Sequence, residues 1–218
     1  MNEIVTHETL TLEQLQAKLL DPNTPERELR PYFIVDQSEP FSPRLAINPR
    51  TVVMPPEEML ATRSATVLNL ANWVARQGRE RRFQERLAQG YDGPVIVSEG
   101  DSWFQYPLIL EDVIDQLLPS YAIKSLDAGG DTLEHMFADK EYLGAIAETG
   151  ASILLLSGGG NDLLAGGDLE RHLRTYDPAL TPAQHLLPSF NLLVDQSIQY
   201  YDRIFREVEQ RFPGVVII

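Results

Sequence analysis

Three short polar segments contain the residue types that acyl transfer requires. They are Asp101-Ser102, Gly129-Gly130-Asp131 and Gly160-Asn161-Asp162. Attack on an ester carbonyl needs a nucleophile and also hydrogen-bond donors aimed at the developing oxyanion. Ser102 can supply the hydroxyl, a glycine turn lets a main-chain N–H approach a substrate closely, and Asn161 offers an uncharged amide donor. These residue types therefore indicate chemistry on an acyl group.

Each segment directly follows a predicted strand. The apolar runs that predict strands lie at 94–97, 121–126 and 153–156, with a fourth at 215–218. Patterns typical of helices separate them, at 107–118, 139–149 and 190–212. Short apolar strands that alternate with helices favour an α/β fold with a parallel sheet covered on both faces. Because ligands bind outside the carboxyl ends of such strands, we expect the three segments to meet at one edge of the sheet.

In this order and context, the segments resemble the SGNH (GDSL-type) serine ester hydrolase family over roughly residues 93–218. The matching motifs are Gly100-Asp101-Ser102 for block I, Gly130-Asp131-Thr132 for block II and Gly159-Gly160-Asn161-Asp162 for block III. The resemblance implies a three-layer α/β/α sandwich with a mostly parallel sheet. It also implies that Ser102 is the nucleophile. The implied oxyanion donors are the main-chain N–H groups of Ser102 and Gly130, with Gly129 as the alternative to Gly130, and the side chain of Asn161.

The resemblance further implies a carboxylic ester hydrolase that works through an acyl-Ser102 intermediate. Its substrate would be a small-molecule, carbohydrate or lipid ester, so the enzyme would be esterase-like, lipase-like or a carbohydrate deacetylase. No cofactor and no metal ion are implied. An acyltransferase of the same family would share every motif, and the sequence indicates neither the acyl chain length nor the alcohol.

One motif of the family is missing. The family's general base is a histidine in an Asp-x-x-His motif, which does not occur in this sequence. The four histidines are His7, His135, His172 and His185. Asp131/His135 and Asp168/His172 are each spaced by four residues, which suits a helix face, and we take His135 as an exposed helical residue rather than a substitute base. We therefore interpret the chain as truncated, with the base expected beyond Ile218 and little or no activity for residues 1–218.

Structural roles compete with the catalytic ones. Ser102 could be an ordinary turn serine, Asn161 a helix cap, and Gly130 a residue that only needs a positive φ. We expect Asp101 and Asp162 to be structural, with hydrogen bonds to the turns that hold Ser102 and Asn161. The aromatic residues that follow Ser102 could line a pocket or pack under the next helix: Trp103, Phe104 and Tyr106.

Three other functions compete with the hydrolase. The first is a catalytically inactive SGNH-like binding or interaction module, with the N-terminal region as its contact arm. The second is a nucleotide-binding module, which the sequence disfavours because its glycines lack dinucleotide-binding spacing and no Gly-Lys-Ser/Thr follows a strand. The third is a metal-dependent hydrolase, but no histidine has ligand spacing with the candidate aspartates Asp101, Asp127, Asp131 and Asp162.

The N-terminal part lacks the alternation of strand and helix patterns and instead mixes helix signals with proline-rich segments. We therefore divide the chain into an accessory region, 1–90, and an α/β domain, 91–218. Thr11 and Gln14 predict a capping box at the start of a helix, and a second short helix could begin at Thr24-Pro25. Six prolines between Pro31 and Pro56 predict an irregular arm. A helical pattern returns from Pro56 to Gln89, with a possible interruption at Gly78.

Composition excludes some partners. The 218 residues include 18 basic and 32 acidic ones, a net charge of −14, which disfavours nucleic acid and anionic lipid. The exception is an arginine run that we assign to the solvated face of a helix: Arg76, Arg79, Arg81, Arg82 and Arg86. There are no cysteines, so disulfides and thiol chemistry are excluded. With no visible signal peptide or membrane span, we expect a cytoplasmic protein; the oligomeric state is not indicated.

Overall fold

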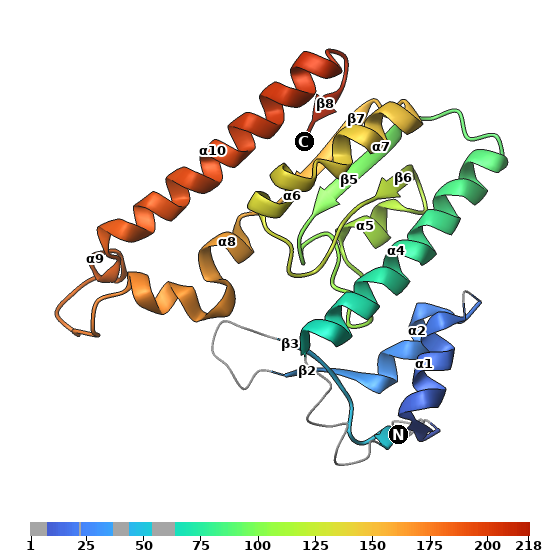
Figure 1. Ribbon diagram of the computed structural model, residues 1–218, viewed down its shortest axis with the longest axis horizontal. Coiled ribbons are helices and arrows are strands. Elements are labelled where there is room, and N and C mark those ends of the chain that lie inside the picture. Colours follow the sequence, from blue (N-terminus) through green and yellow to red (C-terminus); the bar gives the residue numbers. More distant parts are fainter. Residues whose placement is uncertain (1–7, 22, 37–43, 54–63) are drawn as a thin grey trace.

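A four-stranded sheet forms the centre of the computed structural model, which describes residues 8–21, 23–36, 44–53 and 64–218. The strands are β5 (Val95–Gly100), β6 (Ala122–Ser125), β7 (Ile153–Ser157) and β8 (Val216–Ile217). Their order is β6-β5-β7-β8, and all three pairings are parallel. The predicted α/β chain with a parallel sheet is therefore confirmed. The carboxyl ends of β5, β6 and β7 lie at one edge (Figure 1).

Helices pack against both faces of this sheet. One face is covered by α6 (Leu133–Asp139), α7 (Glu141–Thr149) and α10 (Pro188–Arg211), and the other by α5 (Val113–Leu117). Neighbouring residues of β5 point to opposite cores, since Val97 packs with α6, α7 and α10 whereas Ile96 packs with α5. This explains the continuous apolar run. The helix predicted at 107–118 is shorter than expected because Asp112 caps it and accepts the Asp115 N–H.

The N-terminal elements form a second core. The capping box of Thr11 at the start of α1 (Leu12–Leu20) is confirmed, as is a short helix after Pro25, α2 (Glu26–Leu29). The irregular arm predicted for 31–56 is wrong for 31–36 and 44–53, and the rest of this segment lies outside the described residues. Instead, β2 (Phe33–Asp36) pairs antiparallel with β3 (Arg44–Ile47), and β4 (Val52–Val53) pairs with β1 (Leu10–Thr11). Apolar side chains of these strands are buried with those of α1, and no proline lies within a strand, so the prolines do not prevent pairing.

A long helix, α4 (Ser64–Ala88), connects the two cores. It is continuous through Gly78, so the expected interruption is absent, while the expected start near Pro56 lies outside the described residues. One side of α4 packs with α1 and β3, and another runs along β6 at the edge of the sheet (Figure 1). The remaining helices are α8 (Gly160–Leu164), α9 (Pro182–His185) and the 3-10 segments Arg30–Tyr32 and Ala165–His172. Within the described ranges, no helix has the length and apolar character needed to cross a bilayer.

Candidate active site

The turn after β5 fixes the backbone on both sides of Ser102. The buried Asp101 carboxylate accepts the Trp103 N–H at 3.0 Å, while the Asp101 carbonyl accepts the Phe104 N–H at 3.0 Å. Asp101 is thus structural, as the sequence predicted. Ser102 itself is half-buried, and neither its hydroxyl nor its main-chain N–H has a hydrogen-bond partner among the described residues. Trp103 is 71 % exposed, so it does not pack under the following helix, whereas Phe104 packs with α5.

The turn after β6 requires glycine at two successive positions. A Cβ on Gly129 would lie 2.9 Å from the carbonyl oxygen of Gln105, and Gly130 has a φ of 91°. Asn72 of α4 holds this turn from outside, because its amide donates to the Gly129 carbonyl at 3.0 Å and accepts the Gly129 N–H at 2.9 Å. The Gly130 N–H donates to no described residue. Of the two glycines, Gly130 therefore has the free N–H donor, whereas the Gly129 N–H is engaged.

The turn after β7 carries Asn161 toward the turn after β6. Gly159 has a φ of 96°, and a Cβ on Gly158 would lie 2.7 Å from Leu133, so the chain passes close to α6 here. Asn161 lies in α8, and its Nδ2 donates to the Asp131 carbonyl at 2.6 Å. One of the two amide N–H groups is thus engaged and the other remains for a ligand. Asp162 is structural, since its Oδ2 accepts the Leu133 N–H at 3.0 Å.

Hydrogen bonds join the three turns into one assembly. The Ala128 N–H donates to the Gly100 carbonyl at 2.8 Å, which ties the turn after β6 to that after β5. The Asp101 N–H donates to the Ser157 carbonyl at 3.2 Å, which ties the turns after β5 and β7. With the Asn161–Asp131 contact, each turn contacts both others. The backbone segments that carry Ser102, Gly130 and Asn161 therefore lie together at one edge of the sheet, as the sequence predicts.

The described histidines have other partners. His135 is 70 % exposed, and its Nδ1 lies 3.5 Å from Asp131 Oδ1. His172 Nδ1 lies 2.9 Å from the Ser189 hydroxyl, and His185 accepts the Asp177 N–H. None of these three forms a hydrogen bond with Ser102, and His7 lies outside the described residues.

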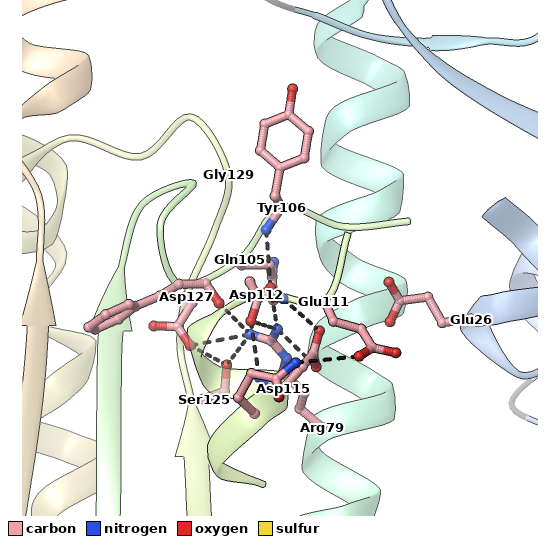
Figure 2. A network of polar contacts seen from close by, with 12 residues as sticks. Glu26, Arg79, Gln105, Tyr106, Glu111, Asp112, Asp115, Ser125, Asp127 and Gly129 are labelled. Atoms are coloured by element: carbon pink, nitrogen blue, oxygen red, sulfur yellow. Dashed lines mark hydrogen bonds and ion pairs between the residues drawn. The ribbon is translucent and has the colours of Figure 1, made fainter. Parts of the chain in front are cut away.

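The assignment of the arginine run to a solvated helix face is wrong for Arg79. This side chain is 4 % exposed, and its guanidinium binds Asp112 at 2.6 Å, Asp115 at 3.2 Å and Asp127 at 3.5 Å (Figure 2). It also donates to the Phe104 carbonyl at 2.9 Å. Arg79 thereby connects α4 to the segment after Ser102. The signal was present in the sequence, since Ala71, Ala75 and Phe83 are buried at helical spacing on the same stripe.

Asp127 belongs to this cluster, and its surroundings shift its pKa. Burial, which outweighs the Arg79 guanidinium and the Ser125 and Ser98 hydroxyls, raises the pKa of Asp127 to about 6. Both hydroxyls donate to its Oδ2, at 2.5 Å from Ser125 and 2.7 Å from Ser98. The four aspartates considered as metal ligands thus have separate structural roles or partners. Among the described residues, no three histidine or acidic side chains are arranged to hold a metal ion.

A cavity of about 530 Å³ opens beside the turn after β6. We call it the α4 pocket, because Asn69, Trp73 and Arg76 of α4 form one wall. The other walls include Glu99 of β5, Gly130 of the turn after β6 and Glu141 of α7. Glu99 was not predicted from the sequence as a site residue. Its signal is a single acidic residue inside a strand that is buried on both faces. The pocket therefore places a buried carboxyl next to one of the proposed oxyanion donors.

Comparison with protein-family models, with curated proteins and with solved structures found no match to this chain.

Proposed function

We propose that the chain is an SGNH-type serine ester hydrolase with its α/β domain arranged as a three-layer sandwich, and that it cleaves acyl esters through an acyl-Ser102 intermediate. One observation carries the proposal. At the joined turns, the N–H groups of Ser102 and Gly130 and one N–H of Asn161 have no described partner, and neither does the Ser102 hydroxyl. Unpaired donors that gather around a nucleophile are what an oxyanion hole requires.

The chemistry follows from these groups. Ser102 Oγ attacks the ester carbonyl and gives its proton to a general base, while the negative charge on the carbonyl oxygen is received by the three N–H donors. Collapse of the tetrahedral intermediate expels the alcohol and leaves the acyl group on Ser102. Water then attacks this acyl-enzyme, which releases the carboxylic acid and returns the proton to Ser102. Residues 1–218 contain no Asp-x-x-His motif, so they do not supply the base that the family resemblance implies.

Short p-nitrophenyl esters test the proposal in the full-length gene product. Ser102→Ala should lower turnover by about 10³-fold or more, because the nucleophile is lost while the donors remain. Ser120→Ala, at an exposed serine after α5, is the matched control and should keep full activity. Equal turnover of Ser102→Ala and the native protein would remove Ser102 from the mechanism.

A catalytically inactive SGNH-like binding module is the second candidate. It is favoured by the observation that no described histidine is hydrogen-bonded to Ser102. Absence of turnover above the Ser102→Ala background for every ester tried would support this alternative.

A further inference from the structure

Glu99 is buried without the partners that buried acids normally have. It is 2 % exposed, and its Oε2 has no hydrogen-bond partner among the described residues. A buried polar atom without a partner destabilises the folded chain, so it calls for a specific explanation. Because Glu99 lines the α4 pocket, a ligand in this pocket can supply the missing partner.

The surroundings of Glu99 shift this residue toward its protonated form. Burial is the main cause that raises the pKa of Glu99 well above its usual range, and the charges of Asp127 and Glu141 raise it further, against the opposing charge of Arg76. A protonated carboxyl has an O–H donor as well as an acceptor oxygen. It suits a hydroxyl or carbonyl group better than an ion.

The arginine that lines the pocket, Arg76, already has partners among its neighbours. Arg76 donates to the carbonyls of Leu126 and Asp127, and its Nη2 lies 3.2 Å from Glu141. The acidic residues Asp131 and Asp139 also line the pocket, so it repels anions such as phosphates. The groups of the pocket without a hydrogen-bond partner include Glu99 and the exposed Asn69 and Trp73, of which Trp73 is 46 % exposed.

These groups define a ligand class. An aromatic side chain beside an amide and a carboxyl can contact the apolar face of a small hydroxyl-bearing molecule and bind its hydroxyl and carbonyl groups. The size of the pocket, about 530 Å³, lies within the range of small-molecule sites. Gly130 lines the same pocket, so a bound molecule would lie next to a proposed oxyanion donor.

We propose that the α4 pocket binds an uncharged, hydroxyl-rich group of the sugar type, with Glu99 as its buried hydrogen-bonding partner and Trp73 as its apolar wall. The inference rests on the proposed function in one respect, since it makes the substrate of Ser102 an ester of a carbohydrate. The binding itself requires neither Ser102 nor turnover.

Saturation-transfer NMR on the chain with Ser102→Ala measures this binding directly, with N-acetylglucosamine as the uncharged probe. Glucosamine serves as the cationic probe and glucose 6-phosphate as the anionic one. N-acetylglucosamine should bind in a saturable manner and more tightly than either charged probe. Stronger binding of glucosamine would assign a cation site, stronger binding of glucose 6-phosphate an anion site, and no saturable binding would remove the sugar site. Each of these three results overturns the proposal.

Variants locate the binding. Glu99→Ala should weaken it about 10-fold, whereas Glu99→Gln, which keeps a donor and an acceptor without charge, should stay within about 3-fold. Glu148→Gln, at an exposed glutamate of α7, is the control for Glu99→Gln. Trp73→Ala changes a half-exposed residue and should weaken binding about 10-fold without unfolding the chain. Binding unchanged in Trp73→Ala would place the probe elsewhere and overturn the proposal.

The two proposals fail separately. If Ser102→Ala abolishes ester turnover but the chain does not bind the sugar, the hydrolase proposal stands and the sugar site is removed. Sugar binding without Ser102-dependent turnover would do the reverse.

Discussion

Two buried acidic residues, Asp127 in the turn after β6 and Glu99 in β5, have different surroundings. Asp127 accepts two serine hydroxyls at Oδ2, while its Oδ1 has no hydrogen-bond partner among the described residues. Its Oδ2 also lies 3.5 Å from the Arg79 guanidinium, which in turn binds Asp112 (Figure 2). Glu99 has a cavity in front of it and no hydrogen-bond partner for Oε2. A buried acid that is hydrogen-bonded and lies beside an arginine stabilises one arrangement of the chain, whereas a buried acid without such partners that lines a cavity is available to a ligand. The contrast separates the scaffold of the candidate site from its binding surface.

The largest effect on stability is expected for substitution of Arg79, the partner of Asp127. Arg79→Met removes the cation and leaves Asp112 and Asp127 buried without compensation, which should lower the free energy of unfolding by about 3–5 kcal/mol. Urea denaturation measures this change. Arg82→Met is the matched control, since Arg82 is exposed and lies 4.0 Å from Asp115, and it should cost under about 1 kcal/mol. If both substitutions lowered the free energy of unfolding by similar amounts, the buried cluster around Arg79 would stabilise the chain no more than a surface ion pair does.

Asn72 should have the next largest effect. Asn72→Ala removes both hydrogen bonds to Gly129 and should lower the free energy of unfolding by about 1–3 kcal/mol. Because the Gly130 N–H is then less well positioned, ester turnover should also fall, by about 10²-fold. Gln77→Ala, at an exposed position of the same helix outside the α4 pocket, is the control for both measurements. A stability loss with full turnover would separate Asn72 from the catalytic turn.

A smaller effect concerns pH. Burial raises the pKa of Asp127 to about 6 from its usual 3.8, and it raises the pKa of Glu99 well above its usual range. Both folded groups keep a proton that the unfolded chain has released, so their contribution to stability is complete below about pH 4 and is lost as the pH rises through the folded pKa. Asp127→Asn should reduce the fall in stability between about pH 4 and 6.

Glu99→Gln should likewise reduce the fall in stability as the pH rises, because burial raises the pKa of Glu99 in the folded chain. Urea unfolding curves at several pH values give both slopes. A fall in Glu99→Gln as steep as in the native chain would mean that Glu99 is ionised in its pocket, contrary to the contrast with Asp127.

The smallest expected effect on stability is that of Glu99→Leu. Replacing an unpartnered buried acid by an apolar side chain should change the free energy of unfolding by less than about 1 kcal/mol or increase it. Binding of N-acetylglucosamine should be lost in the same variant. A stability loss as large as that of Arg79→Met would assign Glu99 to the scaffold.

The sequence allowed the sheet and its functional edge to be predicted because these depend on local patterns. Apolar runs followed by glycine turns located the segments of Ser102, Gly130 and Asn161, and the pairing of β5 with both neighbours then brings the turns together. The roles of α4 depend on contacts distant in sequence. Asn72 and Gly129 are 57 residues apart, and Arg79 and Asp127 are 48 apart. Helical spacing indicates that Arg79 is buried, but nothing local identifies its partners.

Mapping the acylated residue tests the central claim most directly. The full-length gene product is mixed with p-nitrophenyl acetate, quenched in acid within the first turnover, and digested for peptide mass spectrometry. The account predicts one acetylated peptide, modified at Ser102 and absent from Ser102→Ala. Acetylation at another residue, or the same labelled peptide in Ser102→Ala, would contradict it.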